Sequence, residues 1–133
     1  MLTIPRAIYD AMIAHARRDF PLEACGILAG DDGVVTDHYP MANTDQSNEH
    51  FMMEPTEQFA VVKDIRAKGK SMLAIYHSHP ETPARPSEED IRLALTPNVS
   101  YVIISLAAPD LPTLRSFRIT AGTVTEEPVT VVS

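Results

Sequence analysis

The sequence is poor in the residues that mark several classes of protein. Its 133 residues include no tryptophan and a single cysteine, Cys25, so no disulfide can form within the chain and a reducing compartment is expected. No apolar run approaches the roughly 20 residues that a membrane span needs, and the N-terminus lacks the charged-then-apolar layout of a signal peptide. We therefore expect a cytoplasmic protein that has no membrane partner.

Positive charge is scarce as well. Eleven lysines and arginines stand against 18 aspartates and glutamates, which gives a formal net charge of -7. Binding to nucleic acid depends on a basic surface, so nucleic acid is not an expected partner. Hydrophobic residues make up 44% of the chain and charged residues 22%, as is usual for globular proteins. At this length we expect one packed domain over residues 1–133.

The order of hydrophobic patterns predicts an α/β fold. An apolar stripe through Ile8, Met12 and Ala16 predicts a helix over 5–19, and proline and glycine signals place further helices over 55–69 and 87–95. Short apolar runs between turn signals predict strands at 24–29, 34–39, 51–53, 72–76, 101–106, 114–120 and 124–132. This order indicates a mixed β-sheet with helices packed against it, in which 72–76 is covered on both faces.

A candidate metal site follows the apolar run at 72–76. His77 and His79 are two residues apart on an extended segment, which sends both imidazoles to one side. Asp90 lies eleven positions further on, in the first turn of a predicted helix. Two imidazoles and one carboxylate form a three-ligand zinc set that leaves a fourth position for water, which is the catalytic pattern rather than the structural one. The sequence therefore predicts one zinc ion per chain, held by His77, His79 and Asp90.

Two further residues are candidates for the chemistry. Zinc lowers the pKa of a bound water, and a neighbouring carboxylate can then take its proton. Glu23 is the candidate base, since it lies between the first helix and an apolar strand, where a charge needs water or a partner. Ser87 could stabilise an oxyanion, but the string Ser87 to Asp90 also reads as a capping box, and the two roles are compatible. The apolar run around Cys25 favours a buried structural cysteine over a nucleophile.

These residues together resemble a known family. The strings Glu23-Ala24-Cys25-Gly26, His77-Ser78-His79-Pro80 and Ser87-Glu88-Glu89-Asp90 are similar to the signature of the JAMM (MPN+) metalloproteases. The resemblance implies a cytidine-deaminase-like α/β fold, zinc on His77, His79 and Asp90, Glu23 as general base and Ser87 as stabiliser. Members of this family act on the bond after the glycine-rich C-terminal tail of a ubiquitin-like protein, so a zinc metallopeptidase is expected.

The flanking sequence narrows the expected substrate. The segments 14–30 and 123–132 are similar to those of a bacterial family member that cleaves cysteine from the C-terminal glycine of a sulfur carrier protein during cysteine biosynthesis. The expected partner is therefore a ubiquitin-like sulfur carrier protein with a C-terminal Gly-Gly tail. Two alternatives stay open. One is an isopeptidase or a peptidase that processes a carrier precursor, and the other is a non-catalytic MPN-type interaction scaffold.

Overall fold

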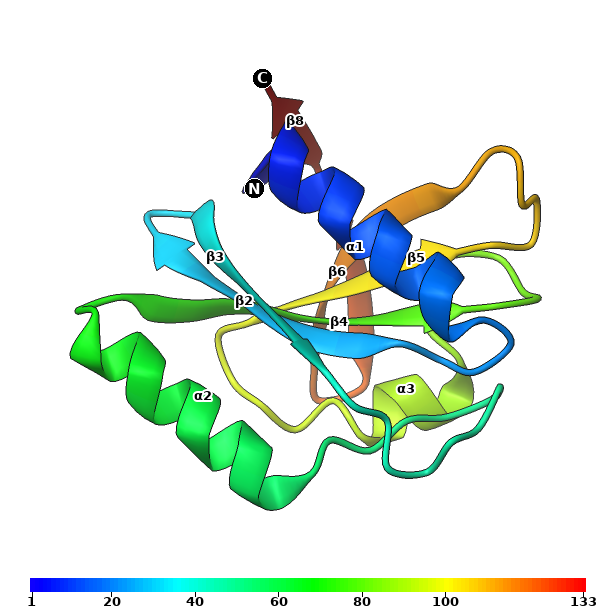
Figure 1. Ribbon diagram of the computed structural model, residues 1–133, viewed down its shortest axis with the longest axis horizontal. Coiled ribbons are helices and arrows are strands. Elements are labelled where there is room, and N and C mark those ends of the chain that lie inside the picture. Colours follow the sequence, from blue (N-terminus) through cyan, green and yellow to red (C-terminus); the bar gives the residue numbers. More distant parts are fainter.

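Eight strands form one mixed sheet in the order β7-β6-β5-β4-β2-β3-β1-β8. The computed structural model describes residues 1–133, and Figure 1 shows how its elements are arranged. The strands are β1 (Leu2–Pro5), β2 (Cys25–Asp31), β3 (Val34–Met41), β4 (Ser71–His79), β5 (Ser100–Ser105), β6 (Thr113–Thr120), β7 (Thr123–Glu127) and β8 (Val129–Val132), and the helices are α1 (Arg6–Asp19), α2 (Pro55–Ala67) and α3 (Glu88–Arg92). Strand β4 pairs in parallel with β5 and antiparallel with β2. The expected mixed sheet with flanking helices is confirmed.

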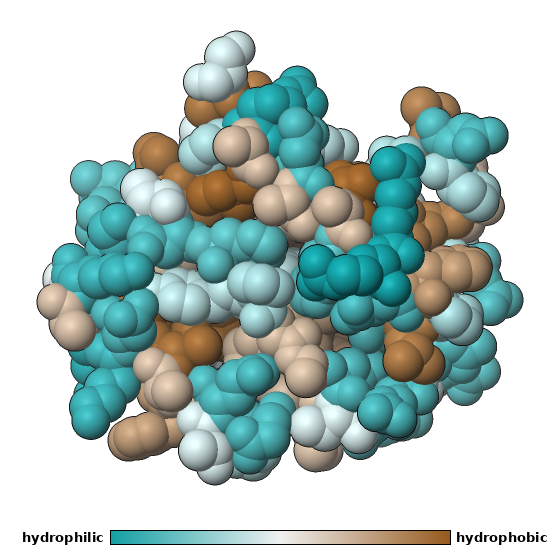
Figure 2. Space-filling view, in the orientation of Figure 1, coloured by the Kyte–Doolittle hydropathy of each residue, from teal (hydrophilic) through white to brown (hydrophobic).

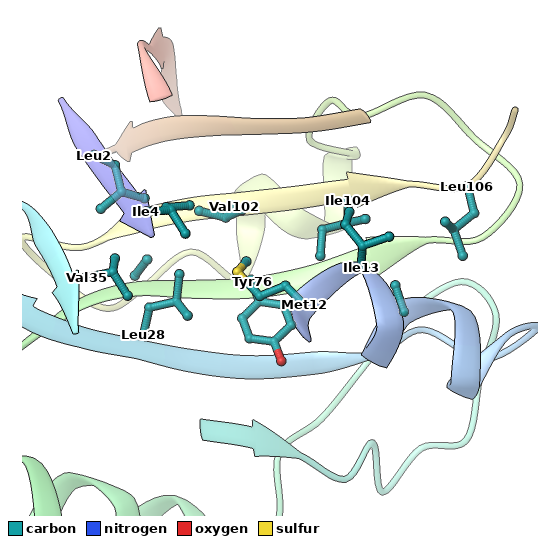
Figure 3. Close-up of a cluster of buried hydrophobic side chains, with 12 residues drawn as sticks. Leu2, Ile4, Met12, Ile13, Leu28, Val35, Tyr76, Val102, Ile104 and Leu106 are labelled. Carbon is teal, nitrogen blue, oxygen red and sulfur yellow. The ribbon is translucent and has the colours of Figure 1, made fainter. Parts of the chain in front are cut away.

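The centre of the sheet is covered on both faces. Successive side chains of β4 alternate between the faces, so Ala74 and Tyr76 join Met12 of α1 in one apolar cluster (Figure 3). Ile75 points the other way and belongs to a second cluster with Ile65 of α2. The continuous apolar run of β4 therefore reflects burial on both sides, as the sequence predicted.

The outer surface mixes polar and apolar residues without one dominant apolar face in the view of Figure 2. Among the exposed large apolar side chains, Leu93 is 56% exposed and Leu95 is 80% exposed, and both follow α3. None of the helices combines the length and the apolar character that crossing a membrane would require.

The predicted strands at 24–29 and 34–39 form an antiparallel hairpin, β2 and β3, whose turn lies at Asp32 and Gly33. Asp32 and Gly33 have φ values of 50° and 77°, both in the left-handed region. Two consecutive positive φ values belong to the tight hairpin turn whose twist matches that of the flanking strands, and glycine takes the second position without strain.

Both ends of the chain differ from the predicted pattern. The expected strand over 124–132 is divided at Pro128, because proline has no N–H to donate to a ladder. Strand β7 then pairs with β6 at one edge of the sheet, whereas β8 pairs in parallel with β1 at the opposite edge. Strand β1 itself was not predicted, since four residues before a helix carry too short a pattern, and α1 begins at Arg6 rather than at Pro5.

Two predicted elements, a strand before α2 and the third helix, also differ from expectation. The predicted strand over 51–53 is wrong, because Met53 forms only an isolated bridge with Asn43. The third helix is shorter than the predicted 87–95 and ends at Arg92. Its last expected residue, Leu95, is largely exposed and gains nothing from helical packing.

Tyr76 brings a polar group into the larger apolar cluster, and Figure 3 shows its hydroxyl pointing away from the other labelled side chains. The hydroxyl lies 2.7 Å from His15 Nδ1 and 2.7 Å from His38 Nε2. His15 Nε2 lies 3.2 Å from the Asp19 carboxylate and donates to it, so His15 Nδ1 accepts the Tyr76 proton. Gly26 makes room for the ring, because a Cβ there would lie 2.3 Å from Tyr76 Cε2.

This cluster predicts a loss of stability in mild acid. Burial lowers the pKa of His38 from 6.5 to about 4, so the unfolded chain binds the proton more readily than the folded one. Stability from neutral His38 is present above pH 6.5 and is lost as the pH falls towards about 4. We expect His38→Gln, which can still donate to Tyr76, to lose less stability than the native chain between neutral pH and pH 4.

Urea unfolding midpoints at a series of pH values measure this effect. His50→Gln is the matched control, since the His50 side chain is 43% exposed and lies outside the cluster. Equal acid sensitivity in His38→Gln and the native chain would show that His38 does not couple folding to protons.

Candidate active site

Two histidines at the end of β4 face the same side of the sheet. The strand runs to His79, three residues beyond the predicted strand, so both rings are placed by regular strand geometry. Their Nε2 atoms lie 3.2 Å apart, and both rings are buried. The structure thus brings His77 and His79 together as their spacing predicted.

The start of α3 supplies a carboxylate at the same point. Asp90 Oδ2 lies 3.2 Å from His77 Nε2 and 3.0 Å from His79 Nε2. The capping box holds this carboxylate, since Ser87 Oγ accepts from the Asp90 N–H at 3.0 Å and Asp90 Oδ2 accepts from the Ser87 N–H at 2.9 Å. Both halves of the predicted capping box are therefore present.

The three donor atoms fit a tetrahedral metal ion. They form a triangle with sides of 3.0, 3.2 and 3.2 Å. A tetrahedral ion with ligand bonds of about 2.0–2.1 Å would hold its ligand atoms about 3.3 Å apart. Among the histidine, cysteine and acidic residues, His77, His79 and Asp90 form the one group that could hold a metal. The donor set is compatible with a metal ion and contains no fourth protein ligand.

The surroundings set the protonation and orientation of this group. Burial acts to raise the pKa of Asp90, but the neighbouring His77 and His79 side chains outweigh it and hold that pKa well below its usual range. His79 Nδ1 donates to the Pro83 carbonyl at 2.9 Å, which leaves the Nε2 lone pair free for a metal. The Phe51 ring stacks on His77 with centroids 4.8 Å apart. Both imidazoles are thus held in one orientation.

Glu23 directly precedes Ala24, which is hydrogen-bonded to Ser78 between the two histidines, and it is unusually placed for an acidic side chain. The residue is 2% exposed, and its Oε1 atom is buried without a hydrogen-bond partner. Burial raises the pKa of Glu23 to about 8, against a lowering by His79 and with a further rise from Asp90. A buried carboxylate without a partner is costly, so its presence here favours a function over a structural role.

Ser78 is a residue whose contribution the sequence did not reveal. Its Oγ accepts from the Ala24 N–H at 2.7 Å, and its own N–H donates to the Ala24 carbonyl at 2.9 Å. These two bonds tie the residue after Glu23 to the residue between the two histidines. The only sequence signal was the position of Ser78 between two predicted ligands.

Cys25 has a structural role, as the apolar run around it predicted. The thiol is fully buried, and burial raises its pKa to about 12, which is opposite to what a nucleophile needs. Its Sγ lies 3.7 Å from the Ala42 carbonyl, and the residue belongs to the apolar cluster beneath α2. A cysteine nucleophile is therefore not supported.

A small cavity opens directly beside the candidate metal site. Its volume is about 160 Å³, and His77 and Asp90 form part of its wall. Apolar and aromatic side chains from four segments form much of the rest, and His50, Pro86 and Glu89 complete the lining; the apolar and aromatic residues are Phe51, Leu93, Tyr101, Ile103 and Ile119. The cavity has room for a narrow, mostly apolar group next to the metal ligands and excludes bulky ones.

Comparison with known proteins assigns the chain to a family. The model for prokaryotic homologs of the JAB domain matches residues 5–120. The chain is 43% identical to a CysO-cysteine peptidase from Mycobacterium tuberculosis, over 99% of this chain and 92% of that protein. It is 36% identical to a probable TtuB-protein conjugate cleaving protease from Thermus thermophilus, over 77% of this chain and 69% of that protein.

A solved structure agrees with these relatives. The solution structure of a protein from Desulfitobacterium hafniense superposes with a TM-score of 0.90 at 49% identity, and the match covers 99% of this chain and 93% of that one. The matched span contains all the strands from β2 to β6 and all three helices that position the site. The chain therefore belongs to the family of prokaryotic JAB-domain homologs and is a hydrolase of the JAMM type.

Proposed function

We propose that this protein is a zinc metallopeptidase that hydrolyses the amide bond after the C-terminal glycine of a ubiquitin-like sulfur carrier protein. The proposed leaving group is L-cysteine, so the reaction would complete a route of cysteine biosynthesis in the cytoplasm. The observation that carries the proposal is the convergence of three donor atoms beside a buried, unpartnered carboxylate. That combination suits metal-assisted hydrolysis of an amide better than a purely structural metal site.

Neighbouring groups of the chain hold the proposed metal ligands in orientation. His77, His79 and Asp90 would hold zinc, which when bound polarises the scissile carbonyl and makes water more acidic. The Pro83 carbonyl fixes the tautomer of His79, and the Phe51 ring fixes the plane of His77. These contacts preorganise the donor atoms for metal binding.

Glu23 acts as the general base. Its carboxylate accepts a proton from the attacking water and returns it to the leaving nitrogen as the amide bond breaks. Burial makes the Glu23 carboxylate more basic, because it raises the pKa to about 8. A carboxylate with a raised pKa is a stronger base than an exposed one, and a cation bound at the neighbouring donors would favour the ionised form that accepts the proton.

Ser87 stabilises the oxyanion that forms on the scissile carbonyl. As a helix cap it uses a lone pair of Oγ to accept from the Asp90 N–H, so its O–H hydrogen stays available to donate. The residue is exposed, and a substrate carbonyl can reach it. The capping bond fixes where the hydroxyl lies, which is what an oxyanion donor needs.

The substrate class is supported by likeness and by size. The relative with 43% identity is named for its action on a CysO-cysteine adduct. A Gly-Gly tail has no side chains, so it can pass close to the buried metal ligands, and the cavity of about 160 Å³ leaves space for a small group at the cut bond. Leu93 lines this cavity, and its exposed side chain offers apolar contact to the body of the carrier.

Release of free cysteine from a purified carrier–cysteine adduct tests the proposal. The zinc-loaded protein should release cysteine and regenerate the carrier with a free C-terminal glycine, as followed by mass spectrometry. A carrier precursor with a C-terminal extension and an isopeptide-linked conjugate are compared at the same concentration. If the precursor or the conjugate is cleaved faster than the adduct, that cleavage is the activity and cysteine release is not. If none of the three is cleaved, the peptidase proposal is rejected.

An isopeptidase is the second candidate, and the likeness to a TtuB-conjugate protease favours it. The same residues would act on the same tail, with a lysine side chain as the leaving group instead of cysteine. A non-catalytic scaffold is less well supported, because a scaffold has no need for three converging donors or an unpartnered glutamate.

A further inference from the structure

We infer that Asn43 is a positioning residue for the general base, which rests on the proposed function of Glu23. Asn43 follows β3 and is 9% exposed. It is not a candidate metal ligand, and it does not line the cavity beside the candidate metal site. Its side chain nevertheless joins the backbone of Glu23 to the loop over 44–52, which carries the ring that stacks on His77.

The Asn43 amide uses its whole hydrogen-bonding capacity on backbone groups. Its Nδ2 donates to the Glu23 carbonyl at 3.1 Å and to the His50 carbonyl at 3.0 Å. Its Oδ1 accepts from the Asp45 N–H at 3.0 Å and from the Met52 N–H at 3.1 Å. An amide can make these four bonds together because it has two donor hydrogens and two acceptor lone pairs.

These bonds close the loop over 44–52 around the buried Asn43 side chain. The Thr44 N–H donates to the Met52 carbonyl at 2.9 Å, so the two ends of the loop are paired. Within the loop, the Ser47 carbonyl accepts from the Glu23 N–H at 2.8 Å. Both backbone groups of Glu23 are therefore bonded to this loop or to its anchor, Asn43. The loop and the base are positioned as one unit.

The same unit reaches the metal ligands. Phe51 lies directly between His50 and Met52, whose backbone groups Asn43 holds. Its ring stacks on His77 at an interplanar angle of 23°. Ser78 holds Ala24 from the other side. Asn43 thus sets where the Glu23 carboxylate stands relative to the rings, a distance on which proton transfer depends steeply.

Asn43→Asp separates this role from simple loop closure. A carboxylate of the same shape keeps both acceptor bonds, from Asp45 and Met52, but replaces the two donor bonds by contacts between oxygen atoms. With the carrier–cysteine adduct we expect kcat to fall about 10- to 100-fold, since small misplacements of a reacting group cost this much. The KM and the zinc content should stay at native values.

Asn43→Ala loses all four bonds, including those on both sides of Phe51, so it should lower kcat at least as far and also lower the zinc content. Asn48→Asp is the matched control, because it makes the same change at an exposed position of the same loop and should leave kcat unchanged. Native kcat in Asn43→Asp, loss of zinc from Asn43→Asp, or loss of the fold in both Asn43 variants would overturn the inference. A native protein that releases no cysteine would instead reject the proposed function.

Discussion

Replacing Asp90 by alanine is expected to remove both the bound zinc and the activity. The carboxylate supplies one of three donor atoms, and it contacts both histidine Nε2 atoms at 3.0–3.2 Å. Loss of a supporting partner of a ligand already costs about 10- to 100-fold in metal affinity, so loss of the ligand itself should cost more. Zinc measured by elemental analysis after dialysis should fall from one per chain to a trace.

Asp90 also closes the capping box, so its removal has a second effect. Without the bond from the Ser87 N–H, the start of α3 loses about 0.5–1.5 kcal/mol, the usual net value of one hydrogen bond. Asp90→Asn separates the two effects, because its amide oxygen still accepts this bond but is a poorer zinc ligand. Glu88→Ala, at an exposed position of the same turn, is the control. Full zinc occupancy in Asp90→Ala would exclude Asp90 from the metal site.

Glu23→Gln is expected to keep the zinc and lose the catalysis. Glutamine has the same shape as glutamate and fits the same buried position, but it cannot accept a proton at neutral pH. Turnover should fall by about two to four orders of magnitude, which is the usual contribution of a general base. Steady-state rates on the carrier–cysteine adduct, together with zinc content, measure both halves of this expectation.

The matched control for Glu23 is Glu49→Gln. Glu49 is exposed and contributes to the rise in the pKa of Glu23 only as the smallest of its named causes. Its replacement should leave turnover near the native value. Native turnover in Glu23→Gln would remove Glu23 from the mechanism, whereas loss of zinc in that variant would assign it a structural role.

The donor set was predictable from sequence because its geometry is mostly local. Strand alternation places His77 and His79 on one side, and the capping pattern from Ser87 to Asp90 fixes the carboxylate at a helix start. The only long-range element is the loop between them, which the prolines keep short and irregular. Family resemblance added the role of Glu23, which the residues alone suggested only weakly.

What the sequence did not reveal depends on contacts between distant segments. Asn43 is 20 residues from Glu23 and looks like any loop asparagine until its four bonds are seen. Strand β1 gains its place from pairing with β8 at the other end of the chain, which no local pattern encodes. The helix predicted through Leu95 ends at Arg92. A periodic apolar pattern does not reveal whether other residues pack against it.

A zinc titration of the chelated protein tests the central claim most directly. Protein freed of metal is mixed with increasing zinc, and cysteine release from the carrier adduct is measured at each ratio. We predict no release without zinc and a rate that rises until one zinc per chain and then stays level. Release that does not depend on zinc, or one bound zinc per chain without any release, would contradict the account.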